Sequence, residues 1–211
     1  RDRDVTGVQT CALPICAFIV RDHQIQSNCI RKLNRLRGLD QLTATIGFGV
    51  APTIQSIKPS SLLSLNSRQN RLDLWMKNQD GIANFFGLQV FCLREGPSSS
   101  TFLFYKEENL KSHLRRNDIR QILRWKGYSG DLNSQLEKLK ENYIKEFPHE
   151  IGFFLGIPSQ DVKGFVLNGG KNYLLNGYWK VYDDVNYATT IFQKYDEARV
   201  RTLDNVLRYI N

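Results

Sequence analysis

Two short apolar segments on either side of a turn limit the folds that this chain can adopt. Residues 88–93 and 101–105 are rich in β-formers, and residues 95–100 between them read Glu-Gly-Pro-Ser-Ser-Ser. This pattern predicts a β-hairpin. Because both segments are apolar on both faces, the hairpin has to be covered on both sides. The sequence therefore predicts a small sheet enclosed by other elements.

Amphipathic segments are available to cover that sheet. Apolar residues recur at helical spacing and predict helices over 34–45, 67–84, 107–114, 118–125, 131–147, 159–167 and 184–209. Gly47 and Gly49 are expected to end the first of these, and Asp131 to cap the fifth. In the second, the apolar stripe consists of Leu72, Trp75 or Met76, Ile82 and Phe86.

Residues 172–182 alternate between apolar and polar side chains, which predicts one half-buried strand. Its apolar face would carry Tyr173, Leu175, Trp179 and Val181, and Gly177 would mark a bulge. Together with the hairpin, this strand predicts an α+β fold. We expect a helix-rich single domain around a small, at least three-stranded, mainly antiparallel sheet.

The N-terminal residues stand apart from this prediction. Residues 5–15 match, in all eleven positions, the first-frame translation of a common short-read sequencing adapter, and Cys16 fits the junction codon. Sequence of that origin is excluded from fold reasoning. We expect residues 1–16 to be an unstructured adapter-derived artefact and residues 39–211 to be one globular domain. Residues 17–38 are either native sequence or an in-frame leader.

Charge and cysteine content exclude several classes of protein. Half of the formal charge of +8 lies in residues 17–38, so the basic balance is weak evidence for a nucleic-acid partner. With Cys11 and Cys16 set aside, Cys29 and Cys92 form neither a disulfide framework nor a metal site. No apolar run approaches 18 residues, so we expect no membrane partner. We expect the protein to be located in the cytoplasm. The cofactor stays unknown.

The most distinctive stretch is residues 148–158, which read Pro-His-Glu-Ile-Gly-Phe-Phe-Leu-Gly-Ile-Pro. It resembles the bacterial domain-of-unknown-function family 3793, which has a Pro-His-Glu motif and a Leu-Gly-Tyr-Pro motif. Ile157 replaces the Tyr. The resemblance extends over residues 51–53, 57–62, 161–165, 170–173 and 177–182, and so spans roughly residue 50 to the C-terminus. Many members carry Cys where Val50 and Asn176 stand, so a thiol site gains no support. The resemblance implies an uncharacterised bacterial protein.

Within these motifs, His149 beside Glu150 could form a proton shuttle or a metal-ligand pair. Adjacent side chains on a regular element diverge, however, so a structural role is the alternative. Glu150 would then lie at a helix N-terminus and His149 would stabilise a loop. No metal site is predicted.

The segment Gly169-Gly170-Lys171-Asn172 could present backbone N–H groups and a cation to an anion. The polar face of the predicted strand, with Tyr178 and Lys180, could complete a ligand site. The alternatives are a turn that needs positive φ and a solvated sheet face. The leading hypothesis is a small ligand bound or transformed near His149, Glu150, Lys171 and Tyr178. It requires those four side chains to share a concave pocket.

A basic helix face is the second candidate. Arg116, Arg120 and Arg124 recur every four residues and could contact phosphates, which would make the protein a protein or nucleic-acid interaction module. No recognised nucleic-acid motif accompanies them, so a solvated face is the alternative.

Overall fold

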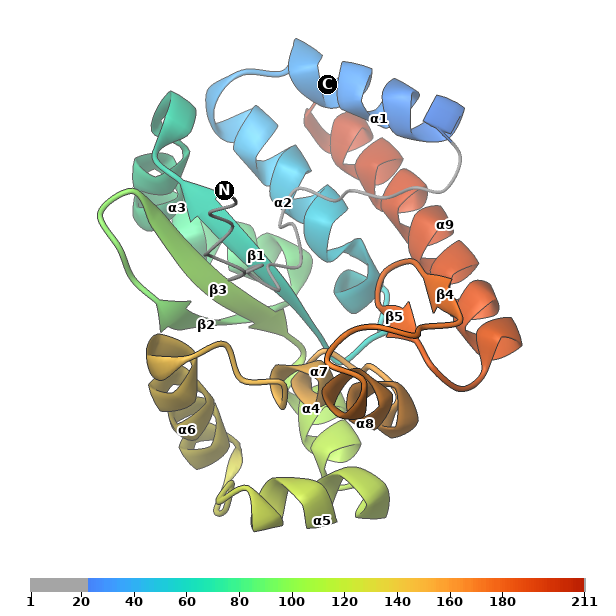
Figure 1. Cartoon of the computed structure of the whole chain (residues 1–211). Coiled ribbons are helices and arrows are strands. Elements are labelled where there is room, and N and C mark those ends of the chain that lie inside the picture. Colours follow the sequence, from blue (N-terminus) through green and yellow to red (C-terminus); the bar gives the residue numbers. More distant parts are fainter. Residues whose placement is uncertain (1–22, 211) are drawn as a thin grey trace, which may run out of the picture.

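A computed structural model describes residues 23–210 of the chain (Figure 1). The expected adapter-derived tail, residues 1–16, lies outside the described residues. The centre of the fold is a three-stranded antiparallel sheet with the strand order β1–β3–β2, made of β1 (Ser60–Asn66), β2 (Gln89–Arg94) and β3 (Ser99–Tyr105). Strand β1 pairs with β3 along its whole length, from Ser60 opposite Tyr105 to Asn66 opposite Ser99. The predicted hairpin and the helix-rich α+β fold are confirmed.

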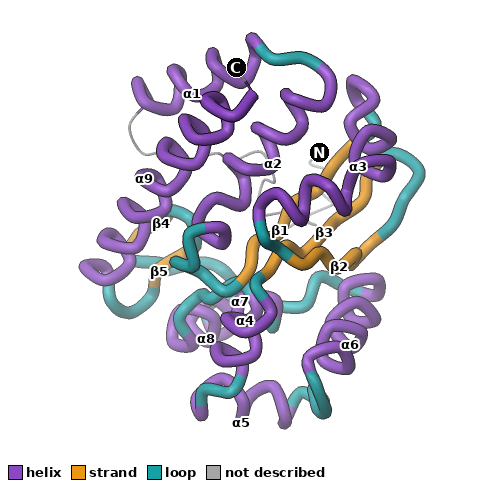
Figure 2. The backbone as a smooth tube through the Cα atoms, turned by 180° about the vertical axis from the view of Figure 1, so that it is seen from behind, coloured by secondary structure: helices purple, strands orange, loops and turns teal. Residues whose placement is uncertain are grey.

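Helices cover both faces of this sheet, as the apolar strands require (Figures 1 and 2). The first layer consists of α1 (His23–Arg35), α2 (Gly38–Ile54), the short 3₁₀ helix η1 (Arg68–Asn70), α3 (Arg71–Phe86) and α9 (Val185–Ile210). On β3, Phe102 and Phe104 face this layer. Their rings lie 5.4 Å and 5.3 Å from the ring of Trp75.

The second layer comes from one continuous part of the chain. It consists of α4 (Glu107–Leu114), α5 (Asn117–Trp125), α6 (Leu132–Lys145), α7 (Ile151–Phe154) and α8 (Ser159–Leu167). Leu93, Leu103 and Tyr105 point from the sheet into this layer, where Leu110, Leu136 and Phe154 are fully buried. Asp131 accepts a 2.8 Å hydrogen bond from the backbone N–H of Ser134, which confirms it as the N-cap of α6.

Helix α2 contradicts the prediction that Gly47 and Gly49 end a helix. It continues to Ile54 and includes Pro52 in its last turn. The reason is packing: Ala44, Ile46, Phe48, Val50 and Ala51 are all fully buried between α9, α3 and the sheet. A Cβ on Gly47 would lie 2.6 Å from Cζ of Phe86, so this glycine allows close helix packing. Tertiary contacts outweigh the low helix propensity of glycine.

The predicted single strand over residues 172–182 is wrong. The segment is a hairpin of two short strands, β4 (Leu175–Asn176) and β5 (Lys180–Val181). Trp179 and Val181 are buried against α9 as expected, whereas Tyr173 is 43% exposed. Gly177 lies in the turn, where a Cβ would be 2.2 Å from the ring of Phe192. This close approach to α9, and not a bulge, requires glycine at position 177.

Two further features concern the ends of the first layer. Trp75 is fully buried and Met76 is 51% exposed, so the stripe of α3 uses Trp75. Helix α1 contributes Cys29 and Leu33 to the core, and Lys32 pairs with Asp204 of α9 at 2.6 Å. The second half of the uncertain segment 17–38 therefore packs against the domain. Among residues 23–210, no helix has the length and apolarity needed to cross a membrane.

Candidate functional site

The Pro-His-Glu motif lies just before α7, and its two polar side chains diverge. Glu150 pairs with Lys126, which follows α5, at 2.9 Å. It makes no side-chain hydrogen bond to the N-terminus of α7, so it does not cap that helix. His149 is exposed, and its ring lies 5.4 Å from the ring of Phe165 in α8. The two residues contact different parts of the second layer.

The Gly-Lys-Asn-Tyr segment connects α8 to the β4–β5 hairpin. Gly169, Gly170 and Asn172 have positive φ, which matches a turn. Lys171 and Asn172 are exposed. Lys180 donates a 2.7 Å hydrogen bond to the carbonyl of Gly170, and its ammonium group lies over the rings of Phe165 and Tyr173. Lys180 thus holds the turn against the hairpin.

Tyr178 faces away from that turn. Its hydroxyl group donates to Asp196 of α9, and the guanidinium group of Arg199 lies 4.7 Å from its ring centroid. Glu150, His149 and Tyr178 therefore contact different parts of the fold. None of the four residues of the leading hypothesis lines either of the two hollows described for residues 23–210. A binding role for these residues stays a prediction.

A structural residue explains much of the motif pattern in this region. Asp161 of α8 is 2% exposed and accepts three hydrogen bonds from the hairpin. One of its oxygens accepts from the indole Nε1 of Trp179 at 2.7 Å, and the other from the backbone N–H groups of Tyr182 and Asp183 at 2.7 Å and 3.1 Å. The motifs at 161–165 and 177–182 meet at this carboxylate, which attaches the hairpin to α8.

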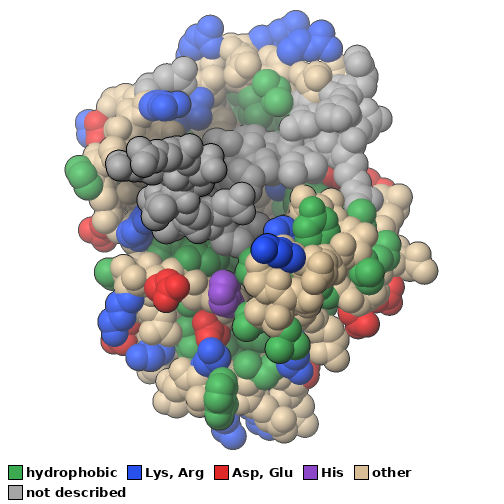
Figure 3. Space-filling view, viewed as in Figure 1, with side chains coloured by type: hydrophobic (Ala, Val, Ile, Leu, Met, Phe, Trp, Pro, Cys, Tyr) green, Lys and Arg blue, Asp and Glu red, His purple; other side chains and the backbone are tan. Residues whose placement is uncertain are grey.

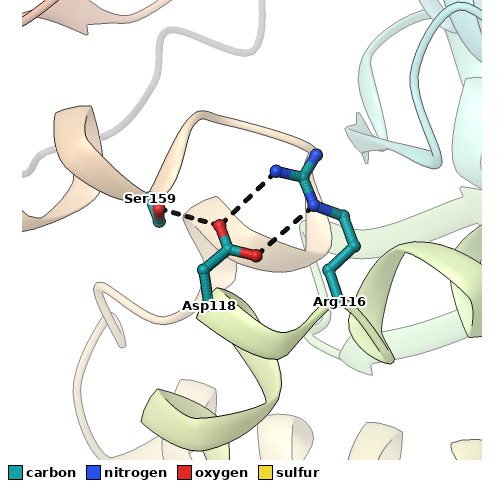
Figure 4. Close-up of polar contacts among 3 residues, drawn as sticks. All are labelled: Arg116, Asp118 and Ser159. Atoms are coloured by element: carbon teal, nitrogen blue, oxygen red, sulfur yellow. Dashed lines mark hydrogen bonds and ion pairs between the residues drawn. The ribbon is translucent and has the colours of Figure 1, made fainter.

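The three arginines of the alternative hypothesis are exposed and differ in their contacts, and their role as a binding face stays a prediction. Arg120 donates to Asn117 at 2.7 Å, and Arg124 is exposed. Arg116 instead bends toward Asp118, with 3.4 Å between its Nε and Oδ1 of the carboxylate (Figure 4). On the face shown in Figure 3, basic side chains are scattered among acidic ones and form no continuous patch.

The Arg116–Asp118 pair borders a hollow of about 460 Å³ in the second layer. Helix α4 contributes His113 to it, the start of α5 contributes Arg116, Asp118 and Ile119, and the start of α9 contributes Tyr187. The remaining wall is the turn between α7 and α8, namely Gly156, Ile157, Pro158, Ser159 and Gln160. The Leu-Gly-Ile-Pro motif therefore lines this hollow, although the Pro-His-Glu motif does not.

Hydrogen bonds order the polar side of the hollow. Ser159 donates its hydroxyl proton to Oδ2 of Asp118 at 3.0 Å, and Arg116 bonds both carboxylate oxygens (Figure 4). Burial alone would raise the pKa of Asp118, but the bond from Ser159 and the charge of Arg116 outweigh it and lower the pKa. Asp118 is thus an anion that holds both neighbours in place.

His113 is the chemically distinctive residue of the hollow. Its Nε2 is buried without a hydrogen-bond partner among residues 23–210. Burial and the charge of Arg116 lower the pKa of His113, so the imidazole is neutral near pH 7. A neutral imidazole has one N–H donor and one acceptor nitrogen, and a hydroxyl group can pair with either.

Sequence reasoning missed His113 and Ser159. His113 lies in a segment recognised only for its helical spacing, and its burial depends on α7, which is 38 residues further along the chain. The sequence signal that could have identified Ser159 is its position directly after the Leu-Gly-Ile-Pro motif. Within residues 23–210, no group of three or more His, Cys, Asp or Glu side chains is arranged to hold a metal ion.

Comparison with known proteins identifies one family. Residues 47–210 match the family model described as "Protein of unknown function (DUF3793)". The match begins inside α2, so α1 precedes it. Neither the curated proteins nor the solved structures contain a significant match.

Proposed function

Because the chain belongs to the DUF3793 family, for which no activity is described, we propose a function from the geometry of the hollow: the protein binds a small polar molecule there. The observation that carries this proposal is the meeting in one hollow of Arg116, Asp118 and His113, whose Nε2 is buried without a hydrogen-bond partner among the described residues. A buried polar atom without a hydrogen bond is costly, and sites that bind ligands are where such atoms gain a partner.

The remaining polar groups of the hollow define the ligand class. Arg116 keeps donor capacity beyond its two long contacts with Asp118, at 3.4 Å and 3.5 Å, and its side chain is 62% exposed. A carboxylate or phosphate oxygen could therefore bind its outer N–H groups. A ligand with a hydroxyl group for His113 and an anionic group for Arg116 would satisfy both.

The size of the hollow agrees with such a ligand. About 460 Å³ is within the range of small-molecule sites. Most of the lining side chains are polar, with Ile157 and Pro158 beside them, which favours a polar ligand. This proposal keeps the small-ligand class expected from the sequence and places it beside the Leu-Gly-Ile-Pro motif.

The test is a ligand-observed NMR screen of a panel of small hydroxy acids, amino acids and phosphate esters. Compounds that bind the wild-type protein should lose binding in His113→Phe, which removes the ring nitrogens, and in Arg116→Gln. Two matched controls are His149→Phe and Arg120→Gln, because both residues are exposed and outside the hollow. The proposal is wrong if the hits bind the His113 and Arg116 variants unchanged, or if no compound of the panel binds.

A further inference from the structure

A second polar cluster, made of residues that do not line the hollow, surrounds Lys58. This lysine belongs to the motif at residues 57–62, in the loop between α2 and β1. The loop is firmly held: the backbone N–H groups of Ile57 and Lys58 both donate to the carbonyl of Pro52, at 2.8 Å and 3.2 Å. Pro59 packs against Gly156, where a Cβ would lie 2.5 Å from its Cδ.

The side chain of Lys58 points toward α9. Its Nζ lies 5.7 Å from the ring centroid of Tyr195, and the side chain is half-buried. One turn further along α9, Arg199 is only 8% exposed, with its guanidinium group over the rings of Tyr178 and Phe48. Two cationic side chains from distant parts of the chain thus approach each other against aromatic rings.

The acidic groups nearby do not reach Lys58. Asp196 accepts the hydroxyl proton of Tyr178. For the part of the chain that the structure describes, no carboxylate lies within ion-pair distance of Nζ of Lys58. The groups that face this amine are therefore the Tyr195 ring and the Arg199 cation, with Tyr178 and Asp196 behind the latter. Burial and the charge of Arg199 lower the pKa of Lys58 to about 7.

A lysine in such surroundings has a chemical use. Desolvation and a neighbouring cation both favour the unprotonated amine, and these are the two means by which proteins activate lysine as a nucleophile. At neutral pH an ordinary surface lysine is almost wholly protonated.

We propose that Lys58 is a nucleophilic amine that condenses with the carbonyl group of a small aldehyde or ketone. The lone pair of Nζ forms the C–N bond while the C=O π electrons move to oxygen, which takes up a proton as nitrogen releases one. Loss of that hydroxyl group with a second proton from nitrogen, as water, leaves an imine. The step needs no oxidant or reductant, and it does not depend on ligand binding at the hollow.

The experiment is competitive labelling of the full chain with trace acetic anhydride from pH 6 to pH 11, with each lysine quantified by peptide mass spectrometry. Lys58 should reach half-maximal acetylation near pH 7. Lys106 is the matched internal control, because it is also half-buried but donates to the carbonyl of Ile54 and to Ser56. The extent of its acetylation at each pH is the reference for that of Lys58.

A carbonyl probe completes the test. The protein is incubated with pyridoxal at pH 7.5 and reduced with sodium borohydride, which converts an imine into a stable adduct. We expect at least a fivefold excess of adduct on Lys58 over Lys106, and a higher labelling midpoint for Lys58 in Arg199→Gln. If the wild-type Lys58 titrates with Lys106, or forms no more adduct than it, the proposal is overturned whether or not the Arg199 variant folds.

Discussion

Asp161 offers the sharpest test of how the hairpin is held. We expect Asp161→Asn to lower the free energy of unfolding by about 3 kcal/mol, although the two side chains have nearly the same shape. One oxygen of Asp161 accepts two backbone N–H groups and the other accepts the indole N–H of Trp179. An asparagine side chain has only one acceptor oxygen. Its NH₂ group therefore has to face either the indole N–H group or the two backbone N–H groups, which are all donors.

The magnitude follows from those contacts. If the oxygen of the new side chain stays on the two backbone groups, one hydrogen bond to a charged acceptor is lost, which costs about 1.5–3 kcal/mol. The introduced NH₂ group and the indole N–H of Trp179 are then both buried without a partner, since Asp161 is 2% exposed and Trp179 is 6% exposed. Each such group costs about 1–3 kcal/mol, reduced by any local relaxation. The lower limits of these costs add up to about 3.5 kcal/mol, and local relaxation brings the expected net loss to about 3 kcal/mol.

The assay is urea unfolding of the single variants Asp161→Asn and Trp179→Phe and of the double variant. Phenylalanine removes the indole donor, so the asparagine should be less harmful beside it, with a coupling energy of about 1–2 kcal/mol. Asp183→Asn is the control: it is the exposed neighbour, and it should change stability by less than about 0.5 kcal/mol. A loss below about 1 kcal/mol for Asp161→Asn, or additive single effects, would refute the reasoning.

Three further predictions concern stability and can be measured by urea unfolding. Gly177→Ala should lower the free energy of unfolding by about 1–3 kcal/mol, because its Cβ would lie 2.2 Å from Phe192. Gly81→Ala, in open space on α3, should raise it by about 0.5–1 kcal/mol. Equal effects of the two substitutions would contradict the packing argument. Asp131→Ala should lower the unfolding midpoint through loss of the α6 cap, and an unchanged midpoint would show that the cap contributes nothing. Burial and the charge of Arg199 lower the pKa of Lys58 from 10.5 to about 7 in the folded protein. Between these two pH values the unfolded chain binds more protons than the folded one. The contribution of Lys58 to the free energy of unfolding therefore rises with pH, by at most about 1.4 kcal/mol per pH unit. The wild type should therefore gain stability relative to Lys58→Met between pH 7.5 and pH 9.5, and parallel pH profiles would contradict the shift.

Local sequence patterns predicted most of the elements, because their signals are short-range. The stripe of α3 and the cap at Asp131 depend on residues within a few positions of each other, and both are as expected. The end of α2 was missed because Gly47 acts through its contact with Phe86, 39 residues later. Helix propensity contains no information about such a partner.

The candidate site was harder to predict for the same reason. The motifs singled out His149 and Lys171, which are exposed, while the hollow depends on His113, whose burial comes from α7. A motif can also owe its pattern to packing, as Asp161 and Trp179 do. Only the Leu-Gly-Ile-Pro motif pointed to a wall of the hollow. The three-dimensional structure was needed to separate the residues that line the hollow from those that hold the fold together.

The two layers on the sheet differ in how they can form during synthesis. The second layer and the strands beneath it are complete once residue 167 has been made, because they come from one continuous stretch. The first layer packs α2 extensively against α9, the last helix. Phe48 and Val50 of α2 therefore stay partly uncovered until the 26 residues of α9 leave the ribosome. A chain that stops before α9 would expose this apolar surface, which is the situation in which nascent proteins aggregate or engage chaperones.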